Sequence, residues 1–468
     1  MALVVAWGAV ACGTAGRDTA TSTSTAPSTS AETTPTSRVP VDAETEAEML
    51  AADAYVWGSP IVVSMRTLQT FGELIGVNRL FSQQELTGPT ARLVVAPNVD
   101  TLYSVAVLDL RGGPLALSIP AVRDRYYTYQ FLDVFTESFA YVGTRATGGD
   151  AGTWLIVPPD WTEPAPAGME IVRASTPQAF LLGRFLVTGP DDLAVARAAM
   201  AQVRLESLAS IEGRAEAALP ALGAPAGTPQ AVAALDASFF DELGDALAIN
   251  PPTAASDRSA LDRFAKIGVG EGLHPAADAR DDEARAVLER GAAMGSARVD
   301  AFVRDTTAAI NGWESREHLG RYGDDFDSRA AVARSAWGAN IPEEAVYLRS
   351  MIDSDGDRYS GARDYRLHFD ADEVPPARAF WSLTVYGDDM FLVEHASGRY
   401  AIGDRTEGLR TNADGSIDLL LSAGAPSREP ANWLPVPDGP FTLVLRIYLP
   451  GAAVLAGSYR VPGVEAIG

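Results

Sequence analysis

The sequence predicts an α+β protein that is mainly β, with an N-terminal β-sandwich, a helical middle section and a C-terminal jelly-roll-like β-sandwich. Short runs of strand-forming residues, separated by turn residues, recur between residues 90 and 190. A helical period replaces them over residues 190–340, and the strand pattern returns from residue 345. The chain has 468 residues, which at about 150 residues per domain also indicates two or three folding units.

The N-terminal domain is expected over residues 41–189. It opens with a predicted helix over residues 42–57, for which Asp42 is placed as the N-cap. Turn residues such as Gly112, Gly113 and Pro114 end the strand runs, and no helical run separates these strands. This pattern predicts an antiparallel sandwich. Its strands are expected at residues 101–110, 125–135 and 153–157.

The helical middle section is expected over residues 190–344, and the C-terminal domain over residues 345–468. Pro190, Asp191 and Asp192 form a helix start signal. The apolar residues that follow at helical spacing are Leu193, Met200, Val203, Leu208 and Ile211. A further helix is expected over residues 281–304, where Gly291 and Gly295 indicate close helix packing rather than a function. The clearest C-terminal strands are expected at residues 380–386, 418–421 and 442–449.

The first 40 residues predict export and a lipid anchor. Residues 2–11 form a short apolar run that leads into Cys12, as in a bacterial lipoprotein signal, where the cysteine is acylated and becomes the new N-terminus. Residues 13–40 consist mostly of Thr, Ser, Ala, Gly and Pro, so they predict a disordered tether. No Lys or Arg precedes the apolar run, so either translation starts upstream of Met1 or the export prediction is wrong. An unmodified Cys12 in a frayed terminus is the alternative. The expected location is the cell envelope, with the protein lipid-anchored to a bilayer and facing outward.

Composition and motifs narrow the chemistry. The formal net charge of -24 disfavours nucleic acid as a partner, since an acidic surface repels phosphate. Cys12 is the only cysteine, so neither an intramolecular disulfide nor a cysteine zinc cluster is available. Four histidines follow neither the HxH nor the HExxH pattern. The loop 353–357 has its glycine at the wrong place for a calcium loop, so a solvated turn is expected. We therefore expect no metal and no cofactor.

Several separated motifs resemble a pair of known families. The first set resembles the domain of unknown function numbered 1254; it comprises Pro97 to Ser104, Arg125 to Tyr127 and Gly143 to Arg145. The second set resembles its usual partner, the domain of unknown function numbered 1214; it comprises Ala379 to Thr384, Asp414 to Ser416, Asn432 to Pro435 and Arg446 to Tyr448. The resemblance implies bacterial proteins, often exported, with an immunoglobulin-like sandwich, a helical middle and a jelly-roll-like sandwich. It also implies self-association, but no agreed substrate and no catalytic residues.

One candidate site lies on the strand at residues 125–135. Alternation of side chains places one aspartate among aromatic residues on a single face: Tyr127, Tyr129, Phe131, Asp133 and Phe135. A buried Asp133 would need a partner or a raised pKa, which suits general acid or base chemistry. The alternative is that Asp133 only accepts hydrogen bonds from tyrosine hydroxyls or from an arginine such as Arg145.

A second candidate site lies on the C-terminal sandwich. There the non-core faces of two strands carry hydroxyls, tyrosines and an arginine, namely Ser382, Thr384, Tyr386, Arg446 and Tyr448. Such a face can bind a polar ring or a carboxylate, and the alternative is an interface between the two sandwiches. Asn98 is expected to close a turn, whereas Asp100 is more open to a functional role.

Two functions remain open, with a metal enzyme as a third and weaker option. The first is an envelope protein that is not an enzyme and binds a small polar or saccharide-like ligand, or a protein, through Tyr127, Tyr129, Tyr386, Arg446 and Tyr448. The second is a metal-independent hydrolase or lyase with Asp100 or Asp133 as base, Arg145 or Arg446 holding negative charge, and Tyr103 as acid. The second function requires these groups to share one pocket.

Overall fold

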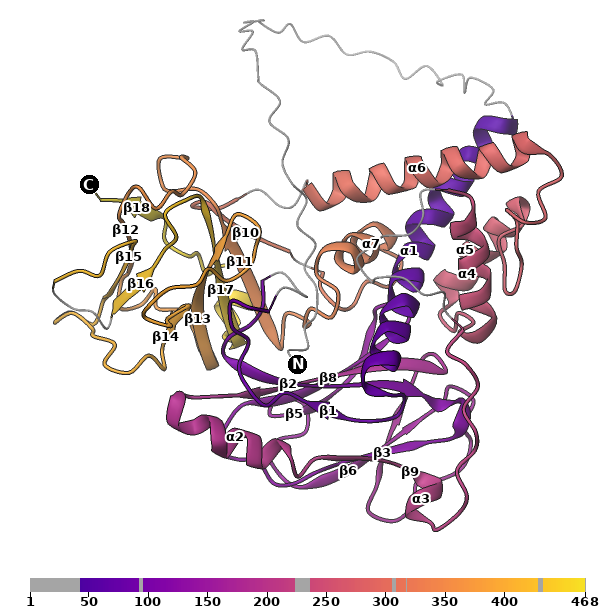
Figure 1. The fold of residues 1–468 in the computed structure, drawn as a ribbon, viewed down its shortest axis with the longest axis horizontal. Coiled ribbons are helices and arrows are strands. Elements are labelled where there is room, and N and C mark those ends of the chain that lie inside the picture. The colour runs from indigo at the N-terminus through magenta and orange to yellow at the C-terminus, as the bar shows by residue number, and fades with distance from the viewer. Residues whose placement is uncertain are drawn as a thin grey trace, which may run out of the picture.

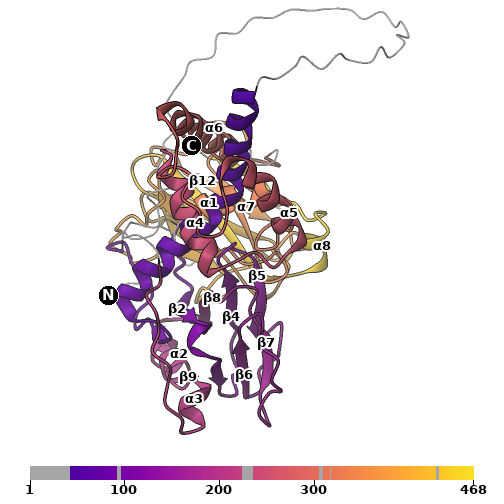
Figure 2. The ribbon, with the colours of Figure 1, turned by 90° about the vertical axis from the view of Figure 1, so that its right-hand side faces the viewer.

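A computed structural model of the chain describes residues 43–91, 96–223, 236–304, 309–316, 318–427 and 432–467. Within them the protein is α+β, with four mostly antiparallel sheets, as the sequence predicts. Two β-rich bodies lie side by side, and most of the helices pack above the N-terminal one (Figures 1 and 2). The predicted signal, Cys12 and the predicted tether lie outside the described residues.

The N-terminal body is built from two sheets with the strand orders β1-β2-β8-β4-β5 and β7-β6-β3-β9. Alternation along β2 explains why this strand is buried on both sides. Ala106 and Leu108 pack into the core between the sheets, whereas Val105 and Val107 pack against the helices. The strands are β1 (Phe81–Ser82), β2 (Thr101–Asp109), β3 (Leu115–Ile119), β4 (Tyr127–Asp133), β5 (Ser138–Gly143), β6 (Gly152–Val157), β7 (Glu170–Arg173), β8 (Gln178–Leu186) and β9 (Arg204–Ser207).

The C-terminal body has the strand orders β10-β11-β17-β13-β14 and β16-β15-β12-β18. The inward faces of β13 and β17 supply its core with Trp381, Leu383, Leu443, Leu445 and Ile447, as the alternation predicts. The strands are β10 (Trp313–Ser315), β11 (Ala345–Ser350), β12 (Tyr365–Phe369), β13 (Ala377–Gly387), β14 (Ala401–Gly403), β15 (Ile417–Ser422), β16 (Trp433–Pro435), β17 (Phe441–Pro450) and β18 (Val464–Ala466).

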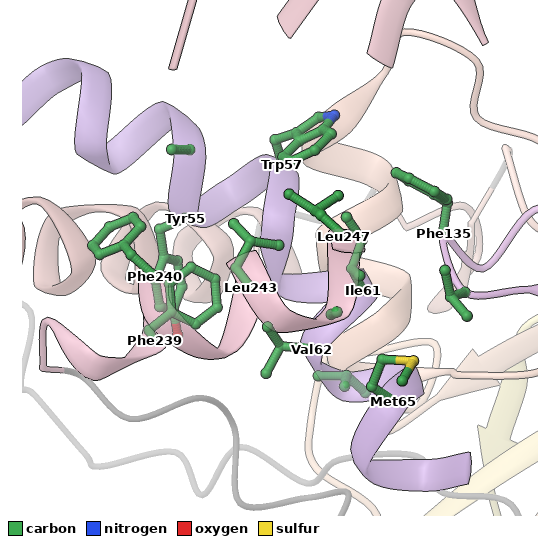
Figure 3. Close-up of a cluster of buried hydrophobic side chains, with 14 of the residues drawn as sticks. Tyr55, Trp57, Ile61, Val62, Met65, Phe135, Phe239, Phe240, Leu243 and Leu247 are labelled. Atoms are coloured by element: carbon green, nitrogen blue, oxygen red, sulfur yellow. The ribbon is translucent and has the colours of Figure 1, made fainter. Parts of the chain in front are cut away.

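Helices α1, α4, α5, α6 and α7 form a layer over the outer face of the sheet that contains β2 and β8. Figure 3 shows apolar side chains of α1 and α4 meeting in this layer, together with Phe135. The α-helices are α1 (Ala43–Ile75), α2 (Leu193–Met200), α3 (Leu208–Ile211), α4 (Ser238–Ile249), α5 (Ala255–Phe264), α6 (Asp282–Arg304), α7 (Phe326–Ser335) and α8 (Ala452–Leu455). The 3₁₀ helices are η1 (Leu110–Gly112), η2 (Pro190–Asp192) and η3 (Ala265–Ile267). None of the helices among the described residues combines the length and the apolar character that crossing a bilayer requires.

Helix α1 continues 18 residues past the predicted end at residue 57, although Gly58, Ser59 and Pro60 follow directly. Pro60 has no N–H for the carbonyl of Val56, but the Ser59 hydroxyl donates a hydrogen bond to that carbonyl at 3.2 Å. Gly58 lies against Leu243 of α4, where a β-carbon would be only 2.5 Å from a leucine methyl. These residues, which usually break a helix, lie inside α1, and Gly58 allows close packing of α1 against α4. The predicted end of the helix at residue 57 was wrong.

The predicted helical spacing from Leu193 to Ile211 is also wrong in part. Helix α2 ends at Met200, and β9 then pairs with β3 before the single turn of α3 begins. Leu205 packs toward the sandwich core between two exposed residues of β9, which is a strand pattern of period two. Four residues of alternation are too few to outweigh the helical spacing on either side.

Helix α6 runs from Asp282 to Arg304, within one residue of its predicted start, and its two glycines pack against α1 as predicted. A β-carbon on Gly291 would lie 2.3 Å from the β-carbon of Ala51, and one on Gly295 would lie 2.7 Å from the carbonyl oxygen of Ala52. The two helices therefore approach each other as closely as their backbones allow.

Replacing Gly291 with alanine is expected to lower the free energy of unfolding by about 1–3 kcal/mol, because the added methyl overlaps Ala51. Where no such contact exists, replacing Gly with Ala inside a helix stabilises the protein by about 0.5–1 kcal/mol. The sign of the change in unfolding free energy therefore shows whether α1 and α6 are in close contact at Gly291. Urea unfolding measures the change. Ala297→Gly, at an exposed position of α6, is the control and should cost only about 1 kcal/mol from helix propensity. A Gly291→Ala variant as stable as the parent would contradict the close approach.

Candidate functional site

The outer face of β13 and β17 binds a loop of the N-terminal body. Arg446 donates to the Ala96 carbonyl at 3.0 Å, and the Tyr386 hydroxyl donates to the Pro97 carbonyl at 2.6 Å. The side-chain amide of Asn98 donates to the Tyr448 hydroxyl at 2.7 Å. These hydrogen bonds form an interface between the two sandwiches, which is the alternative that the sequence predicts for this face.

Asp100 belongs to the same seam between the two bodies. Its carboxylate accepts hydrogen bonds from the Ser382 hydroxyl at 2.5 Å and from Arg405 at 2.8 Å. Its backbone N–H donates to the Asn98 side-chain carbonyl at 2.6 Å, so Asn98 closes a turn as predicted. Asp100 is 7% exposed and is held as one half of an ion pair across the seam.

A pocket opens beside this loop, between the two bodies. It contains about 490 Å³ of space between atoms, open solvent at its mouth included. Its lining comes from three parts of the chain: Thr87, Ala96, Pro97, Asn98, Tyr103 and Arg184; then Trp337, Gly338 and Ala339; then Tyr347, Arg446 and Tyr448. Three of the sequence-predicted site residues, Tyr103, Arg446 and Tyr448, thus meet in one cavity.

Two arginines of this pocket are buried without a carboxylate. Arg184 and Arg446 are 4% and 3% exposed. Arg184 donates to Gln130 at 2.9 Å, to Asn340 at 3.0 Å and to the Gly338 carbonyl at 2.7 Å. Besides the Ala96 carbonyl, Arg446 donates to Thr384 at 2.8 Å and to the Tyr386 hydroxyl at 2.7 Å. Neither guanidinium forms an ion pair with any acidic residue that the structure describes.

Both guanidiniums remain charged at neutral pH. Burial acts to lower the pKa of Arg184 and of Arg446, yet both pKa values lie above the ordinary value, and an arginine side chain keeps its proton in proteins. An arginine side chain has no acceptor atom, so each one can only donate hydrogen bonds. The pocket therefore carries two fixed positive charges in a poorly hydrated place.

Two amide side chains fix which way the tyrosine hydroxyls of the pocket point. The carbonyl of Asn340 accepts from Arg184, so its NH₂ group donates to the Tyr347 hydroxyl at 2.9 Å. The carbonyl of Asn98 accepts from a backbone N–H, so its NH₂ group donates to Tyr448. Burial raises the pKa of Tyr448 and of Tyr103, so both hydroxyls keep their protons at neutral pH.

The remaining predicted residues lie outside the pocket. Tyr127 and Tyr129 are buried in the core between the N-terminal sheets, where the Tyr127 hydroxyl donates to the Gly148 carbonyl at 3.1 Å. Arg145 pairs with the buried Glu344 at 2.5 Å, and the Tyr126 hydroxyl donates to the same carboxylate at 2.8 Å. Of the groups named for a hydrolase or lyase, Tyr103 and Arg446 line the pocket, whereas Asp133 and Arg145 do not.

Asp133 closes a turn at the end of β4 instead of facing aromatic rings. Its carboxylate accepts from the backbone N–H groups of Phe135 and Glu137, both at 2.9 Å, and from the Ser175 hydroxyl at 2.6 Å. Phe135 packs with the helices, whereas Tyr127, Tyr129 and Phe131 pack between the sheets. Burial raises the pKa of Asp133 to about 7, against the effect of the Ser175 hydrogen bond.

Sequence reasoning did not find Arg184, Trp337 or Tyr347. Arg184 lies in β8, whose nine residues are all buried, and a single cation in such an apolar run (QAFLLGRFL) was an available signal. Trp337 and Tyr347 carry no comparable signal, because only the folded chain places them beside Arg184.

Comparisons with known proteins identify two families and one fold. Residues 77–207 match the family described as "Protein of unknown function (DUF1254)", and residues 344–452 match "Protein of unknown function (DUF1214)". The crystal structure of the VPA0106 protein from Vibrio parahaemolyticus is similar, with a TM-score of 0.72, 24% sequence identity, and coverage of 90% of this chain and 100% of that chain. A putative uncharacterized protein from Burkholderia cenocepacia matches with a TM-score of 0.46, 16% identity, and coverage of 92% and 91%. No curated protein matches the sequence. The Vibrio structure shows that this fold also occurs in a protein of Vibrio parahaemolyticus.

The raised pKa of Asp133 predicts a pH-dependent stability. The folded protein holds this proton up to about pH 7, whereas the unfolded chain loses it near the ordinary aspartate pKa of about 3.9. The contribution of Asp133 to stability is therefore complete below about pH 4 and is lost as the pH rises to about 7. Relative to Asp133→Asn, the parent should lose about 1.4 kcal/mol of unfolding free energy per pH unit in this window. Urea unfolding between pH 4.5 and about 8.5 measures the difference.

The exposed Asp160 offers a matched control, because Asp160→Asn should track the parent at every pH. An Asp133→Asn difference that stays constant across the window would show that the folded carboxyl titrates normally.

Proposed function

Because the chain belongs to the proteins that join a DUF1254 region to a DUF1214 region, and the pocket lies between these regions, we propose that the protein binds a small anionic ligand there. Arg184 comes from the DUF1254 region and Arg446 from the DUF1214 region. The proposed ligand sits between these two guanidiniums. The protein then acts as a ligand-binding protein whose site exists only when both regions are docked.

One observation carries the proposal: two guanidiniums that line a single pocket are buried with no carboxylate beside them among the described residues. A buried charge without a counter-charge costs several kcal/mol, so such groups are normally paired. A bound anion supplies the missing partner. The planar guanidinium also matches carboxylate and phosphate oxygens with two parallel hydrogen bonds.

A neutral saccharide fits these groups less well than an anion. Sugar hydroxyls can accept the hydrogen bonds that tyrosine and arginine offer, but they leave both positive charges unbalanced. The same reasoning favours a small anion over a protein partner whose surface lacks an acidic side chain to insert. We therefore propose that the small polar ligand predicted from the sequence is an anion.

The binding test uses the full chain and simple anions as probes. Acetate, benzoate, succinate and inorganic phosphate are added at constant ionic strength, and thermal unfolding and calorimetric titration are recorded against sodium chloride. At least one of these anions is expected to raise the unfolding temperature through ligand binding. Arg184→Gln is expected to weaken its binding by about 10- to 100-fold, since it removes a charge-assisted hydrogen bond.

Arg145→Gln is the matched control variant. It removes another arginine of the seam, but one that pairs with Glu344 and does not line the pocket. This variant should lose stability and keep its anion affinity. If no probe anion shifts the parent beyond sodium chloride, or if both variants lose affinity equally, the proposed site is wrong.

We further propose that the protein is exported and tethered outside the cell by an acylated Cys12. The apolar run at residues 2–11 and the Thr/Ser/Pro-rich segment at residues 13–40 support this proposal. On finer architecture, we propose an immunoglobulin-like N-terminal and a jelly-roll-like C-terminal sandwich, because each body packs two sheets around one core.

The anchor is tested by labelling cells that produce the full chain with radioactive palmitate. The parent is expected to carry the label and to sediment with membranes, whereas Cys12→Ser should do neither. The double variant Cys12→Ser/Ser30→Cys provides a control whose only cysteine stands at the wrong place. Recovery of unlabelled parent protein that still begins at Met1 would refute the anchor.

A further inference from the structure

We infer that the ligand is a compact dianion, such as a small dicarboxylate or a phosphate group, whose two negative charges are shared between Arg184 and Arg446. This inference rests on the proposed function and specifies the ligand that the pocket takes. It follows from the charges, the hydrogen-bonding polarity and the layout of the pocket.

Among the residues that the structure describes, neither guanidinium of the pocket has a carboxylate as its ion-pair partner. Asp100 contributes to the electrostatic field at Arg446, but its carboxylate already pairs with Arg405 at 2.8 Å. The titratable groups that act most strongly on Arg184 are tyrosines, namely Tyr347, Tyr103 and Tyr448, and none of them is a carboxylate. A single negative charge would leave one guanidinium unmatched in a buried place, whereas a dianion matches both.

Four backbone carbonyls of the pocket lining already accept hydrogen bonds from donors of the protein. The carbonyls of Ala96 and Gly338 accept from Arg446 and Arg184, and that of Pro97 accepts from Tyr386. The carbonyl of Ala339 accepts from Gln130 at 2.9 Å. A ligand that needs acceptors therefore meets few available ones.

Donors, by contrast, remain available. The Tyr448 hydroxyl accepts from Asn98, and no described group accepts the Tyr448 proton. Tyr103 presents its ring 5.7 Å from the Arg184 guanidinium, and its hydroxyl likewise keeps its proton. A fully ionised dicarboxylate or phosphate group is an acceptor-only ligand, so its polarity is the complement of this lining.

The layout makes the ligand a bridge between the two bodies. Arg184 extends from β8 and Arg446 from β17, and both act electrostatically on Tyr103 and on Tyr448. Both guanidiniums therefore lie near Tyr103 and Tyr448. Because both arginines line this one pocket, a compact ligand held in it is near both guanidiniums.

The test compares probes of equal size that differ by one charge. Succinate and its monoamide, succinamate, are titrated into the full chain at pH 7.5 and constant ionic strength, with inorganic phosphate as a third probe. The dianions are expected to bind about 10- to 100-fold more tightly than succinamate. The better of succinate and phosphate distinguishes a dicarboxylate site from a phosphate site.

Variants of Arg184 show whether the selectivity comes from the second charge. Arg184→Gln should reduce the preference for succinate over succinamate to about onefold, whereas Arg184→Lys keeps the charge and should keep most of the preference. A ratio of affinities stays informative even when a variant is less stable. If succinamate binds the parent as tightly as succinate, the dianion inference is overturned and anion binding stands. If no anion binds, the proposed function fails as well.

Discussion

The hydrogen bond from Arg446 to the Ala96 carbonyl fixes the seam on which the rest of the structure depends. Ala96 has a φ of 48°, a backbone conformation that residues other than glycine rarely adopt. Its N–H donates a hydrogen bond to the Met390 carbonyl at 2.6 Å. Both polar backbone groups of this one residue are therefore held by the C-terminal body. The same loop places Asn98 against Tyr448 and Asp100 against Arg405, and it also forms a wall of the pocket. Docking of the two bodies and formation of the site are one event.

The local charge of the pocket opposes that of the whole molecule. The chain carries a formal net charge of -24, whereas the pocket is lined by two guanidiniums that form no ion pair with a carboxylate of the described residues. At physiological ionic strength, charges beyond about 8 Å are largely screened, so the acidic surface acts weakly on a ligand already inside the pocket. The acidic surface instead opposes the approach of large polyanions, and this favours small anions over nucleic acid.

The sequence predicts the elements of this fold better than it predicts the site. Alternation in β17 correctly separates the core residues Leu443, Leu445 and Ile447 from Arg446 and Tyr448, because the side of a strand follows from its period. The same alternation does not predict which part of the chain packs against the outer face of β17. Asn98 and Tyr448 are 350 positions apart and bond only because two bodies dock, so their pairing has no local signal. Asp133 illustrates a different limit, since a strand end that turns into a loop changes which neighbours a side chain meets.

The two arginines of the pocket lie in β8 and β17, so the pocket depends on both family regions being present in one protein. A fragment that carries only the first family region would keep one guanidinium and expose the Ala96 loop, and a fragment with only the second would bare the polar face of β13 and β17. Neither fragment would contain all the residues that line the cavity. Separation of the two coding segments by a gene fission would therefore abolish the site in one step, whereas a change in the length of the connecting helices could be tolerated as long as the seam closes.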